Sequence, residues 1–376
     1  MKILHIITAL GNGGAEHTLY KICKHDKSNE HTVISFKGEG KYFSLLNEIG
    51  VKVYILKTNP ITFFLKFFLL MKMIRFLNPD LVQTWLVHGD FLGSIATRLA
   101  GIKKIVWNIR YSNLEFKSTK LITILLIRVL SKLSFSLPKS IVVVSKSAKK
   151  NCEKIGYCKK KLFLIQNGYD LSILKPIKSQ KINFRKNLKI KKEVAVIGMV
   201  ARYTNKKDHN NLLNALSLLR SKNINFICIL VGPDNNKKNL DLTNKIKELN
   251  LNNYIKLLGS KNDITQVMNW IDIYVQSSKY GEGFPNVVAE AMACGTPCVV
   301  TDVGDAALIV GKTGYVVPPN NSFKLGRAIE RMILEINKKN WSKKKNQSKL
   351  RIKNNFGINI MIKSYNKLWN KVHYKN

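Results

Sequence analysis

Acidic residues are scarce in this sequence of 376 residues, where 23 Asp and Glu stand against 63 Lys and Arg and leave a net charge of +40. Residues 336–376 carry 12 basic residues and no acidic one, and residues 174–192 carry eight. Such a field attracts nucleic acid, anionic membranes or anionic substrates. The sequence is also rich in Lys, Asn and Ile together, as codon bias towards A and T would produce. Because no zinc finger, RNP-like pattern or KH-type GxxG loop is present, nucleic-acid binding is the less favoured class.

Paired cysteines, leader segments and long apolar runs are lacking too. The six cysteines form no CxxC pair and show no metal-ligand spacing, so we expect free thiols in a reducing cytoplasm. The opening MKILHIITALGNGG lacks the apolar core and cleavage site of a signal peptide. Residues 61–77 and 120–133 are strongly apolar, but Lys and Arg interrupt both before the roughly 18 to 20 apolar residues of a spanning helix. They suit either the headgroup region of an anionic membrane or burial on a sheet, and the basic chain favours peripheral attachment to the inner face of the cytoplasmic membrane.

What the sequence does contain is a repeated alternation of short apolar runs with helical stretches. This pattern predicts two α/β domains with parallel sheets, in keeping with the chain length. We expect an N-terminal domain at 1–172, a basic linker at 173–192, a C-terminal domain at 193–355 and a final helix at 356–376 that could cross back. The expected strands are 2–8, 31–36, 51–56, 80–85, 104–109, 139–145, 162–166, 194–201, 225–232, 254–259, 272–278, 297–303 and 314–318.

A glycine-rich turn, GNGGAEHTLYKI, follows the first expected strand. A strand, a glycine turn and a helix that opens near Ala15 can form an anion site, because backbone N–H groups and the positive end of the helix dipole face the anion. The dinucleotide fingerprint fails, since Glu16 occupies the third glycine position and the run 31–36 does not end in an acidic residue. An anion-binding loop and an ordinary tight turn both remain open here.

A pair of glutamates, Glu282 and Glu290, lies in the segment SSKYGEGFPNVVAEAMACGTPCVVTD. Seven residues separate them, with a Gly-Phe-Pro-Asn turn and the start of an expected helix between them. The helix start offers donors to a phosphate, and the two carboxylates offer acceptors to sugar hydroxyls. The spacing alone would suit a solvated helix face, but its position after an apolar strand favours a nucleotide-sugar pocket.

The stretch EGFPNVVAEAMACGTPCVVTDVG resembles the E-x7-E donor-site signature of glycosyltransferase family 4, whose members have the GT-B fold. GGAEHTL resembles the N-terminal glycine loop of that family, IQNGYD its Asn-Gly turn before the second domain, and VARYTNKKDH its Arg-and-Lys phosphate loop. The resemblance covers essentially the whole chain. It implies two Rossmann-like domains facing across a cleft, and transfer of a sugar from a nucleotide sugar, usually a UDP-sugar, with retention of configuration. The acceptor would be a lipid-linked sugar or a growing surface glycan.

The resemblance also assigns roles to single residues. Arg202 and Lys207 would bind the diphosphate, the first as a bidentate fork and the second as a point charge. Glu290 would hold the ribose hydroxyls and Glu282 the transferred sugar. The remaining donor contacts would come from the turn and the glycine loop, at Gly283, Phe284, Asn286, Gly13 and Gly14.

No Asp-x-Asp triplet occurs in the sequence. A metal-bridged diphosphate normally needs such carboxylates, so we expect neither a metal nor another cofactor. Arg202 and Lys207 would then stabilise the leaving diphosphate, and the protein would act mainly by positioning and electrostatics.

The acceptor side departs from the family pattern in one place. Many members carry an HxH pattern at the end of the fourth strand, where this sequence has Gln83 and Trp85. His88 follows three residues later, and we count it with Arg202, Lys207 and Glu282 as catalytic, with Asp90 able to orient it. Glu16 and Arg110 complete the expected acceptor side, although a structural ion pair is an equal alternative for Arg110.

Two other functions remain open. A nucleotide-sugar epimerase or hydrolase would use the same fold, but His88 and Asp90 are the only candidate acid–base groups for it. The other is a basic protein that binds nucleic acid or anionic lipid and whose catalytic cleft is inactive. Such a protein need not keep Arg202, Lys207 and both glutamates, so their presence argues against it. The donor sugar, the acceptor, the linkage and the oligomeric state do not follow from the sequence.

Overall fold

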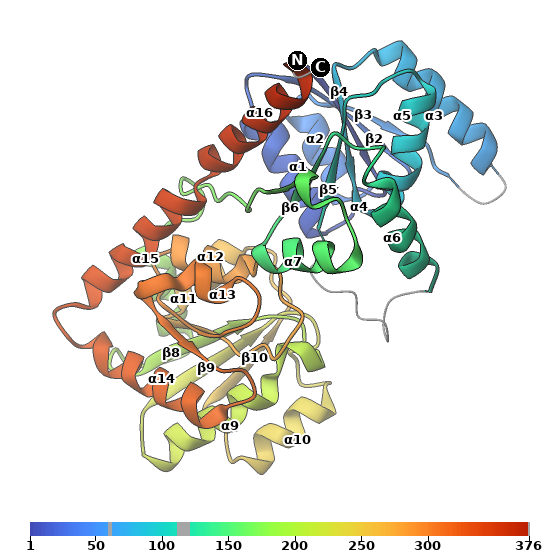
Figure 1. Ribbon diagram of the computed structural model, residues 1–376. Helices are drawn as coiled ribbons and strands as arrows, with labels where there is room; N and C mark the ends of the chain where they lie inside the picture. Colours follow the sequence, from blue (N-terminus) through green and yellow to red (C-terminus); the bar gives the residue numbers. More distant parts are fainter. Residues whose placement is uncertain (59–61, 111–120, 375–376) are drawn as a thin grey trace. The chain divides into compact units, whose positions relative to one another are not determined.

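The computed structural model describes residues 1–58, 62–110 and 121–374, and the chain forms two compact units (Figure 1). The first unit contains Met1–Gly168 and Ile358–Asn376, and the second contains Tyr169–Gly357. The chain therefore leaves the first unit once and returns to it at its C-terminal end.

The sheet of the first unit has seven parallel strands in the order β3-β2-β1-β4-β5-β6-β7. The strands are β1 (Lys2–Ile7), β2 (Glu30–Ser35), β3 (Lys52–Ile55), β4 (Leu81–Trp85), β5 (Ile105–Ile109), β6 (Ser140–Val143) and β7 (Leu162–Leu164). The strand order reverses between β1 and β4. At such a point the loops after the two strands diverge, and ligands of parallel α/β sheets bind beyond the carboxyl ends of these strands.

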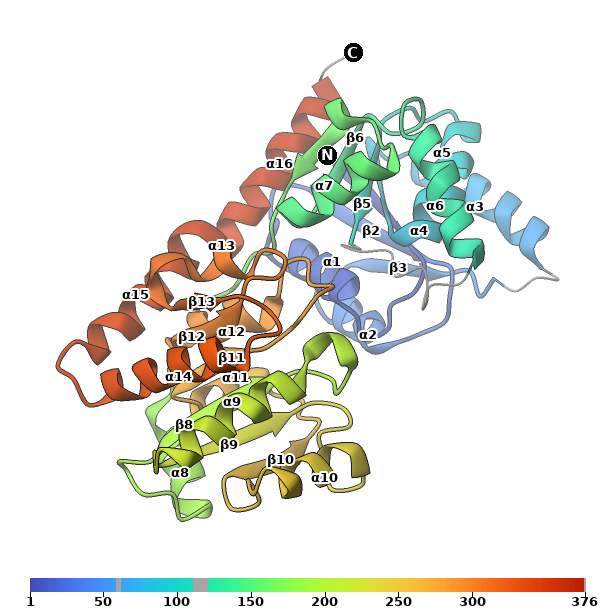
Figure 2. The same ribbon diagram turned by 60° about the horizontal axis from the view of Figure 1, so that its bottom comes forward.

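Helices cover both faces of this sheet (Figure 2). They are α1 (Gly14–His25), α2 (Lys41–Glu48), α3 (Phe63–Leu77), α4 (Leu86–His88), α5 (Ser94–Leu99), α6 (Leu121–Leu133), α7 (Lys146–Ile155) and α16 (Ile358–Tyr374), with a π-helical turn η1 (Gly89–Gly93) and a 3-10 turn η2 (Lys159–Lys161). Successive strand residues point to opposite faces. Ile3 and Ile7 therefore pack with α1, α2 and α16, whereas Leu4 and Ile6 face α3 and α5.

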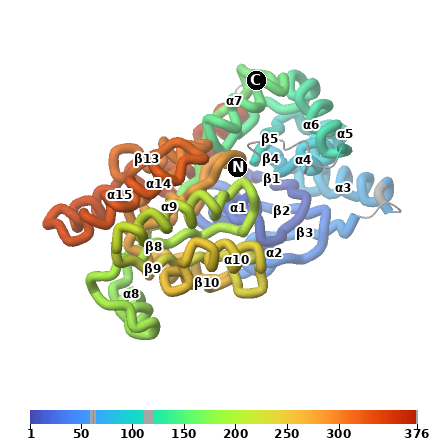
Figure 3. The backbone as a smooth tube through the Cα atoms, turned by 90° about the horizontal axis from the view of Figure 1, so that it is seen from below, coloured from blue at the N-terminus to red at the C-terminus, as the bar shows by residue number. Residues whose placement is uncertain are grey.

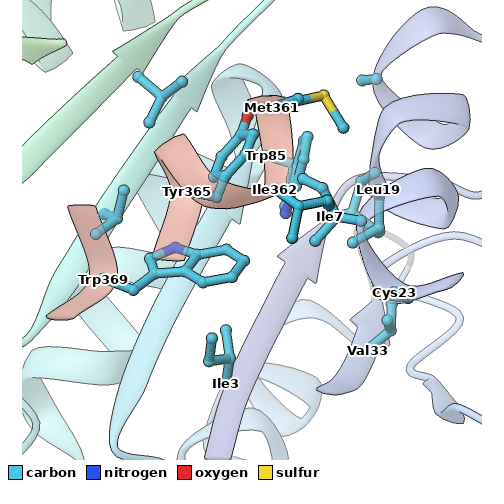
Figure 4. Close-up of a cluster of buried hydrophobic side chains, with 14 of the residues drawn as sticks. Ile3, Ile7, Leu19, Cys23, Val33, Trp85, Met361, Ile362, Tyr365 and Trp369 are labelled. Carbon is cyan, nitrogen blue, oxygen red and sulfur yellow. The ribbon is translucent and has the colours of Figure 1, made fainter. Parts of the chain in front are cut away.

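Helix α16 follows the second unit in sequence but belongs to the core of the first. Its residues Met361, Tyr365 and Trp369 lie against Ile7 and Leu19 (Figure 4). Tyr365 and Trp369 are fully buried. The final helix thus completes one face of the N-terminal sheet.

The second unit contains a six-stranded parallel sheet in the order β10-β9-β8-β11-β12-β13. The strands are β8 (Ala195–Val200), β9 (Phe226–Val231), β10 (Ile255–Gly259), β11 (Ile273–Gln276), β12 (Cys298–Thr301) and β13 (Tyr315–Val317). Here the strand order reverses between β8 and β11, so the same rule places a site after these two strands.

The helices of the second unit again lie on both faces of its sheet (Figure 1). They are α8 (Lys178–Asn187), α9 (His209–Ser221), α10 (Leu240–Glu248), α11 (Ile264–Trp270), α12 (Asn286–Ala293), α13 (Ala306–Val310), α14 (Ser322–Ile336) and α15 (Trp341–Phe356), with 3-10 turns η3 (Asn205–Lys207) and η4 (Gly311–Thr313). Helices α9, α10 and α14 share one core with the sheet, and α9 and α10 lie side by side (Figure 3).

The basic segment expected to be a linker instead contains α8, which packs within the second unit. The Phe184 ring stacks on Trp270 at a centroid distance of 4.5 Å, and Asp272 pairs with both Lys181 and Arg185. A buried acid and an aromatic partner, both distant in sequence, order this segment, so its composition alone is misleading.

The expected strands and the two parallel sheets are confirmed. Strands buried on both faces are continuous apolar runs, which is the signal that the sequence displays. The two apolar segments form α3 and α6; their first residues, Ile61 and Lys120, lie outside the described residues, as do residues 375 and 376 of the final segment. None of the described helices combines the length and apolar character needed to cross a bilayer.

Candidate functional site

Two loops meet where the strand order of the second sheet reverses. One follows β8 and carries Lys207; the other follows β11 and carries Glu282. Ser277 Oγ donates to the carbonyl oxygens of Lys207 and Asp208, at distances of 3.0 and 2.9 Å. The backbone N–H of Lys279 donates to the Lys206 carbonyl at 2.9 Å. These bonds tie the two loops together and fix the main chain at Lys207.

Lys207 and Glu282 form the centre of this site. Lys207 Nζ lies 2.5 Å from Glu282 Oε1, and Ser278 Oγ donates to the same oxygen at 2.7 Å. The two charged side chains are only 18% and 10% exposed, so water screens their attraction little. Arg202 lies on the loop after β8 with its side chain exposed, and among the described residues it has no hydrogen bond or ion pair.

The turn between the glutamates is held by aromatic packing. Phe284 is buried, with the Tyr169 ring at a centroid distance of 6.4 Å and the Phe356 ring at 5.4 Å. Asn286 begins α12 and accepts a hydrogen bond from Tyr169 Oη at 2.6 Å. Since the Phe284 ring is enclosed, this residue can offer a ligand its backbone rather than its side chain.

Helix α12 places Asn286 and Glu290 on one face, because residues four apart lie one above the other on a helix. Glu290 is half-buried. The turn with Glu282 and Gly283 therefore leads directly into the helix that carries the second glutamate.

The loop after β12 supports the same turn through Gly304. Its φ is +63°, and an added Cβ would lie 2.5 Å from the Glu282 carbonyl oxygen and 2.6 Å from that of Gly283. The next N–H, of Asp305, donates to the Gly283 carbonyl at 2.8 Å. Only glycine allows this close approach at a left-handed φ.

In the first unit the glycine turn leads into α1 as expected. Gly13 is the N-cap residue and Gly14 the first helical residue. A Cβ at Gly13 would overlap the carboxylate of Glu16, which is 9% exposed and folds back over the turn. An acidic side chain therefore already lies near the positive end of this helix, and a bound anion would have to share that end with it.

His88 and Asp90 follow β4, the strand beside β1 at which the order of the first sheet reverses, but the two side chains do not pair. Among the described residues no hydrogen bond joins them; Asp90 is buried and accepts one from Thr84 Oγ1 at 2.6 Å. Burial raises the pKa of Asp90 well above its ordinary value, which favours the neutral acid. The prediction that Asp90 orients His88 is therefore wrong. Partial burial of its ring, and next the charge of Lys37, lower the pKa of His88, so the imidazole is predominantly neutral at pH 7.

In the part of the chain that the structure describes, Arg110 forms side-chain hydrogen bonds within the first unit, and not the ion pair that the sequence left open as an alternative. Its Nη1 donates to Asn167 Oδ1 at 2.7 Å and its Nη2 to Tyr365 Oη at 2.8 Å. The guanidinium also lies 5.3 Å from the centroid of the Trp85 ring. Arg110 therefore links the carboxyl end of β5 to the Asn-Gly turn and to α16.

One group of described residues has the composition of a metal site: His5, Cys23 and His31, all buried, with ligand atoms within 4.8 Å of one another. Trp85 Nε1, which can only donate, bonds to His5 Nδ1 at 3.2 Å. His5 Nε2 lies 3.0 Å from His31 Nδ1, and His31 Nε2 lies 3.1 Å from an Asp26 oxygen. A proton on Nε2 of each ring satisfies the whole chain of bonds, so all four ring nitrogens already have protein partners.

Three residues of this candidate site were not predicted from the sequence: Ser277, Ser278 and Gly304. A usable signal existed for the serines, because two adjacent hydroxyl residues end an apolar strand just before Glu282. The position of Gly304 against the turn depends on the neighbouring strand and has no local signal.

Sequence models of two families match the chain, "Glycosyltransferase Family 4" over residues 12–173 and "Glycosyl transferases group 1" over residues 180–349. N,N'-diacetylbacillosaminyl-diphospho-undecaprenol alpha-1,3-N-acetylgalactosaminyltransferase of Campylobacter jejuni is 27% identical, over 96% of this chain and 98% of that protein. UDP-Gal:alpha-D-GlcNAc-diphosphoundecaprenol alpha-1,3-galactosyltransferase of Escherichia coli is 27% identical over 72% of each.

Solved structures share the architecture over the whole length. HepE of Anabaena in complex with UDP has a TM-score of 0.85 at 23% identity, covering 98% of this chain and 99% of that chain. A glycosyltransferase from Rickettsia africae has a TM-score of 0.83 at 22% identity, covering 100% and 99%. With one family match on each unit and this fold throughout, the chain belongs to glycosyltransferase family 4 and has the GT-B fold.

Proposed function

We propose that this glycosyltransferase moves a hexose-type sugar from a UDP-sugar to a lipid-linked acceptor, with retention of configuration. The observation that carries the proposal is the meeting of Lys207 and Glu282, with Arg202 on the same loop as Lys207, after β8 and β11. A cation for a diphosphate and a carboxylate for sugar hydroxyls suit one nucleotide-sugar ligand. The Campylobacter and Escherichia relatives bear names with undecaprenol diphosphate acceptors, which supports a polyprenyl-linked acceptor here.

In the proposed reaction the second unit stabilises the leaving group. Arg202 and Lys207 hold the diphosphate, while Glu290 accepts hydrogen bonds from the ribose hydroxyls and Glu282 from the sugar. The bond between the anomeric carbon and the diphosphate oxygen breaks. The acceptor oxygen bonds to the same face of that carbon, and its proton passes to the departing diphosphate. The cations, rather than a metal, then neutralise the charge that develops on this group.

The first unit would supply the acceptor side. His88 is neutral at pH 7 and lies after β4, so its imidazole can accept a hydrogen bond from a neighbouring, unreactive hydroxyl of the acceptor and help to position it. Glu16 lies in α1, after the neighbouring strand β1. Arg110 and Asp90, whose side chains are bonded inside this unit, would support the acceptor side by holding strand ends in place.

We further propose that the enzyme works on the surface of an anionic membrane. Large apolar side chains stay exposed on α3 and α6, and they include Leu65 at 73%, Phe76 at 86% and Leu121 at 83%. The two helices lie on the same face of the first sheet, and both lack acidic residues. Exposed apolar residues beside Lys and Arg suit the headgroup region, where a lipid-linked acceptor is held.

A transfer assay with a panel of UDP- and GDP-sugars and a synthetic polyprenyl-diphosphate sugar tests the proposed reaction. We expect one donor to be used, and the anomeric configuration of the product, read by NMR, to match the donor. Glu290→Ala should lower kcat/KM roughly 10- to 100-fold, the effect of a lost hydrogen bond to a charged group. Glu248→Ala, an exposed glutamate on α10, should retain full activity. Inversion would refute the proposed stereochemistry, and a protein that neither turns over nor binds any of these nucleotides would refute the function.

A further inference from the structure

The Lys207–Glu282 contact has a consequence for how the site distinguishes its ligands. Resting on the proposed function, we propose that Glu282 competes with the diphosphate for Lys207, and that Ser278 is a positioning residue which holds Glu282 during this exchange. The site would then bind a nucleotide sugar in preference to the free nucleoside diphosphate. Glu282 would thereby help to expel the product.

The contact is short and little exposed to water. Lys207 Nζ and Glu282 Oε1 are 2.5 Å apart, and both side chains are largely buried. A diphosphate that draws Lys207 towards itself must weaken or break this ion pair. In the proposed pose the ribose hydroxyls go to Glu290, so a free nucleoside diphosphate presents only phosphate oxygens to Glu282, and these are acceptors like the carboxylate. A nucleotide sugar carries hydroxyl groups that can donate to the carboxylate.

Ser278 is placed to keep the carboxylate in position. Ser278 is fully buried, and its Oγ donates a hydrogen bond to Glu282 Oε1 at 2.7 Å. Thr301 Oγ1 donates to the carbonyl oxygen of Ser278 at 2.6 Å. When Lys207 turns to the diphosphate, Oε1 therefore retains one donor and is not left without any partner. Ser277 makes the corresponding contribution to the backbone of Lys207. Adjacent serines thus fix the two partners of one exchangeable ion pair.

Isothermal titration with UDP and GDP tests the competition, using the full chain and whichever nucleotide binds. Glu282→Gln removes the competing charge at nearly constant shape, so we expect the nucleotide to bind at least about fivefold more tightly, which is the upper end of what a surface salt bridge contributes. This gain should be clearly smaller in the Lys207→Met background, because the carboxylate then has no ammonium to hold and only its direct repulsion of the diphosphate is removed. Glu290→Gln, a matched change in the same site, should weaken binding.

The titration separates the inference from the function on which it rests. Equal or weaker nucleotide binding by Glu282→Gln, with a wild type that binds, would overturn the competition alone. An equal gain in the Lys207→Met background would also overturn it. A wild type that binds neither UDP nor GDP would refute the donor site itself and the inference with it.

Ser278 is tested through catalysis, since it acts through Glu282. We expect Ser278→Ala to leave nucleotide affinity within about twofold, because Lys207 is untouched, and to lower kcat about tenfold, the cost of one charge-assisted hydrogen bond. Ser278→Thr keeps the hydroxyl and should restore most of kcat. A Ser278→Ala enzyme with wild-type kcat, or one that the threonine variant does not rescue, would overturn the positioning role.

Discussion

At the scale of single residues, the geometry of the candidate site depends on glycines as much as on charges. Gly304 has φ +63° and approaches two carbonyl oxygens of the turn that carries Glu282. Gly304→Ala should therefore lower the free energy of unfolding by about 3 kcal/mol or more, from left-handed strain of 1–2 kcal/mol plus the overlap. It should also displace Glu282 and weaken nucleotide-sugar binding. Chemical denaturation and a binding titration would measure both effects.

Gly259 provides a matched control for that change. Its φ is +61°, and nothing lies within 4 Å of an added Cβ. Gly259→Ala should show only the strain of about 1–2 kcal/mol and normal ligand affinity. If the two alanine variants lose the same stability and both bind normally, the close approach at Gly304 does not support the turn.

The sequence points to the charged residues of the candidate site more readily than to their partners. The spacing of Glu282 and Glu290 and the loop with Arg202 and Lys207 are local patterns, and they carry the family resemblance. That Lys207 pairs with Glu282, 75 positions along the chain, depends on β8 and β11 being neighbours in the sheet. Asp90 shows the reverse case, since its proximity to His88 in sequence suggested a contact that the fold does not make.

At the scale of elements, α3 has two faces with different tasks. Leu70 and Ile74 pack against the first sheet, whereas Leu65 and Phe68 are exposed. If the outer face enters a membrane, replacing both exposed residues with serine should reduce binding to phosphatidylglycerol-containing vesicles at least about tenfold, given the apolar surface lost. Co-sedimentation with vesicles would measure the change. The affinity for the nucleotide, which is measured without vesicles, should remain the same.

Phe323 on α14 supplies the control, because its side chain is also strongly exposed (61%) but belongs to the second unit. Phe323→Ser should bind vesicles like the wild type. Full vesicle binding by the α3 double variant would show that this face does not contact lipid. A loss with Phe323→Ser equal to that of the α3 variant would instead indicate nonspecific apolar adsorption.

The buried strands were predicted well from the sequence, whereas the helix in the basic segment 173–192 was not. The strands read as apolar runs because the sheets are covered on both faces. The segment with α8 has a composition typical of a linker, and it becomes helical structure through Asp272 and Trp270 of the same unit. Local composition does not contain this information.

At the scale of the whole molecule, the return of the chain to its first unit joins both ends of the sequence in one core. Trp369 of α16 is fully buried and donates from Nε1 to Gln83 Oε1 at 2.7 Å. Trp369→Ala should lower the stability of the first unit by about 3–5 kcal/mol, from the lost aromatic surface and the cavity. Thermal unfolding would measure it, and nucleotide affinity below the transition should change little, because Lys207 and Glu282, on which the proposed donor site rests, belong to the second unit.

Lys367→Ala on the exposed side of the same helix is the control, with an expected change within about 0.5 kcal/mol. If Trp369→Ala and Lys367→Ala have the same unfolding transition, α16 does not contribute to the core of the first unit as the structure indicates.

The sequence by itself determined the two α/β domains with parallel sheets, the position of each strand, and the family, through the resemblance that its Arg, Lys and Glu motifs carry. These features are local. A strand that is buried on both faces of a sheet is a short apolar run, and the motifs that carry the resemblance each lie within one short segment. Only the tertiary structure decided that Lys207 contacts Glu282, that two serines and Gly304 support them, and that the final helix completes the first sheet. Each of these depends on which strands are neighbours and on where a distant segment packs, and such contacts leave no pattern within any one stretch of the chain.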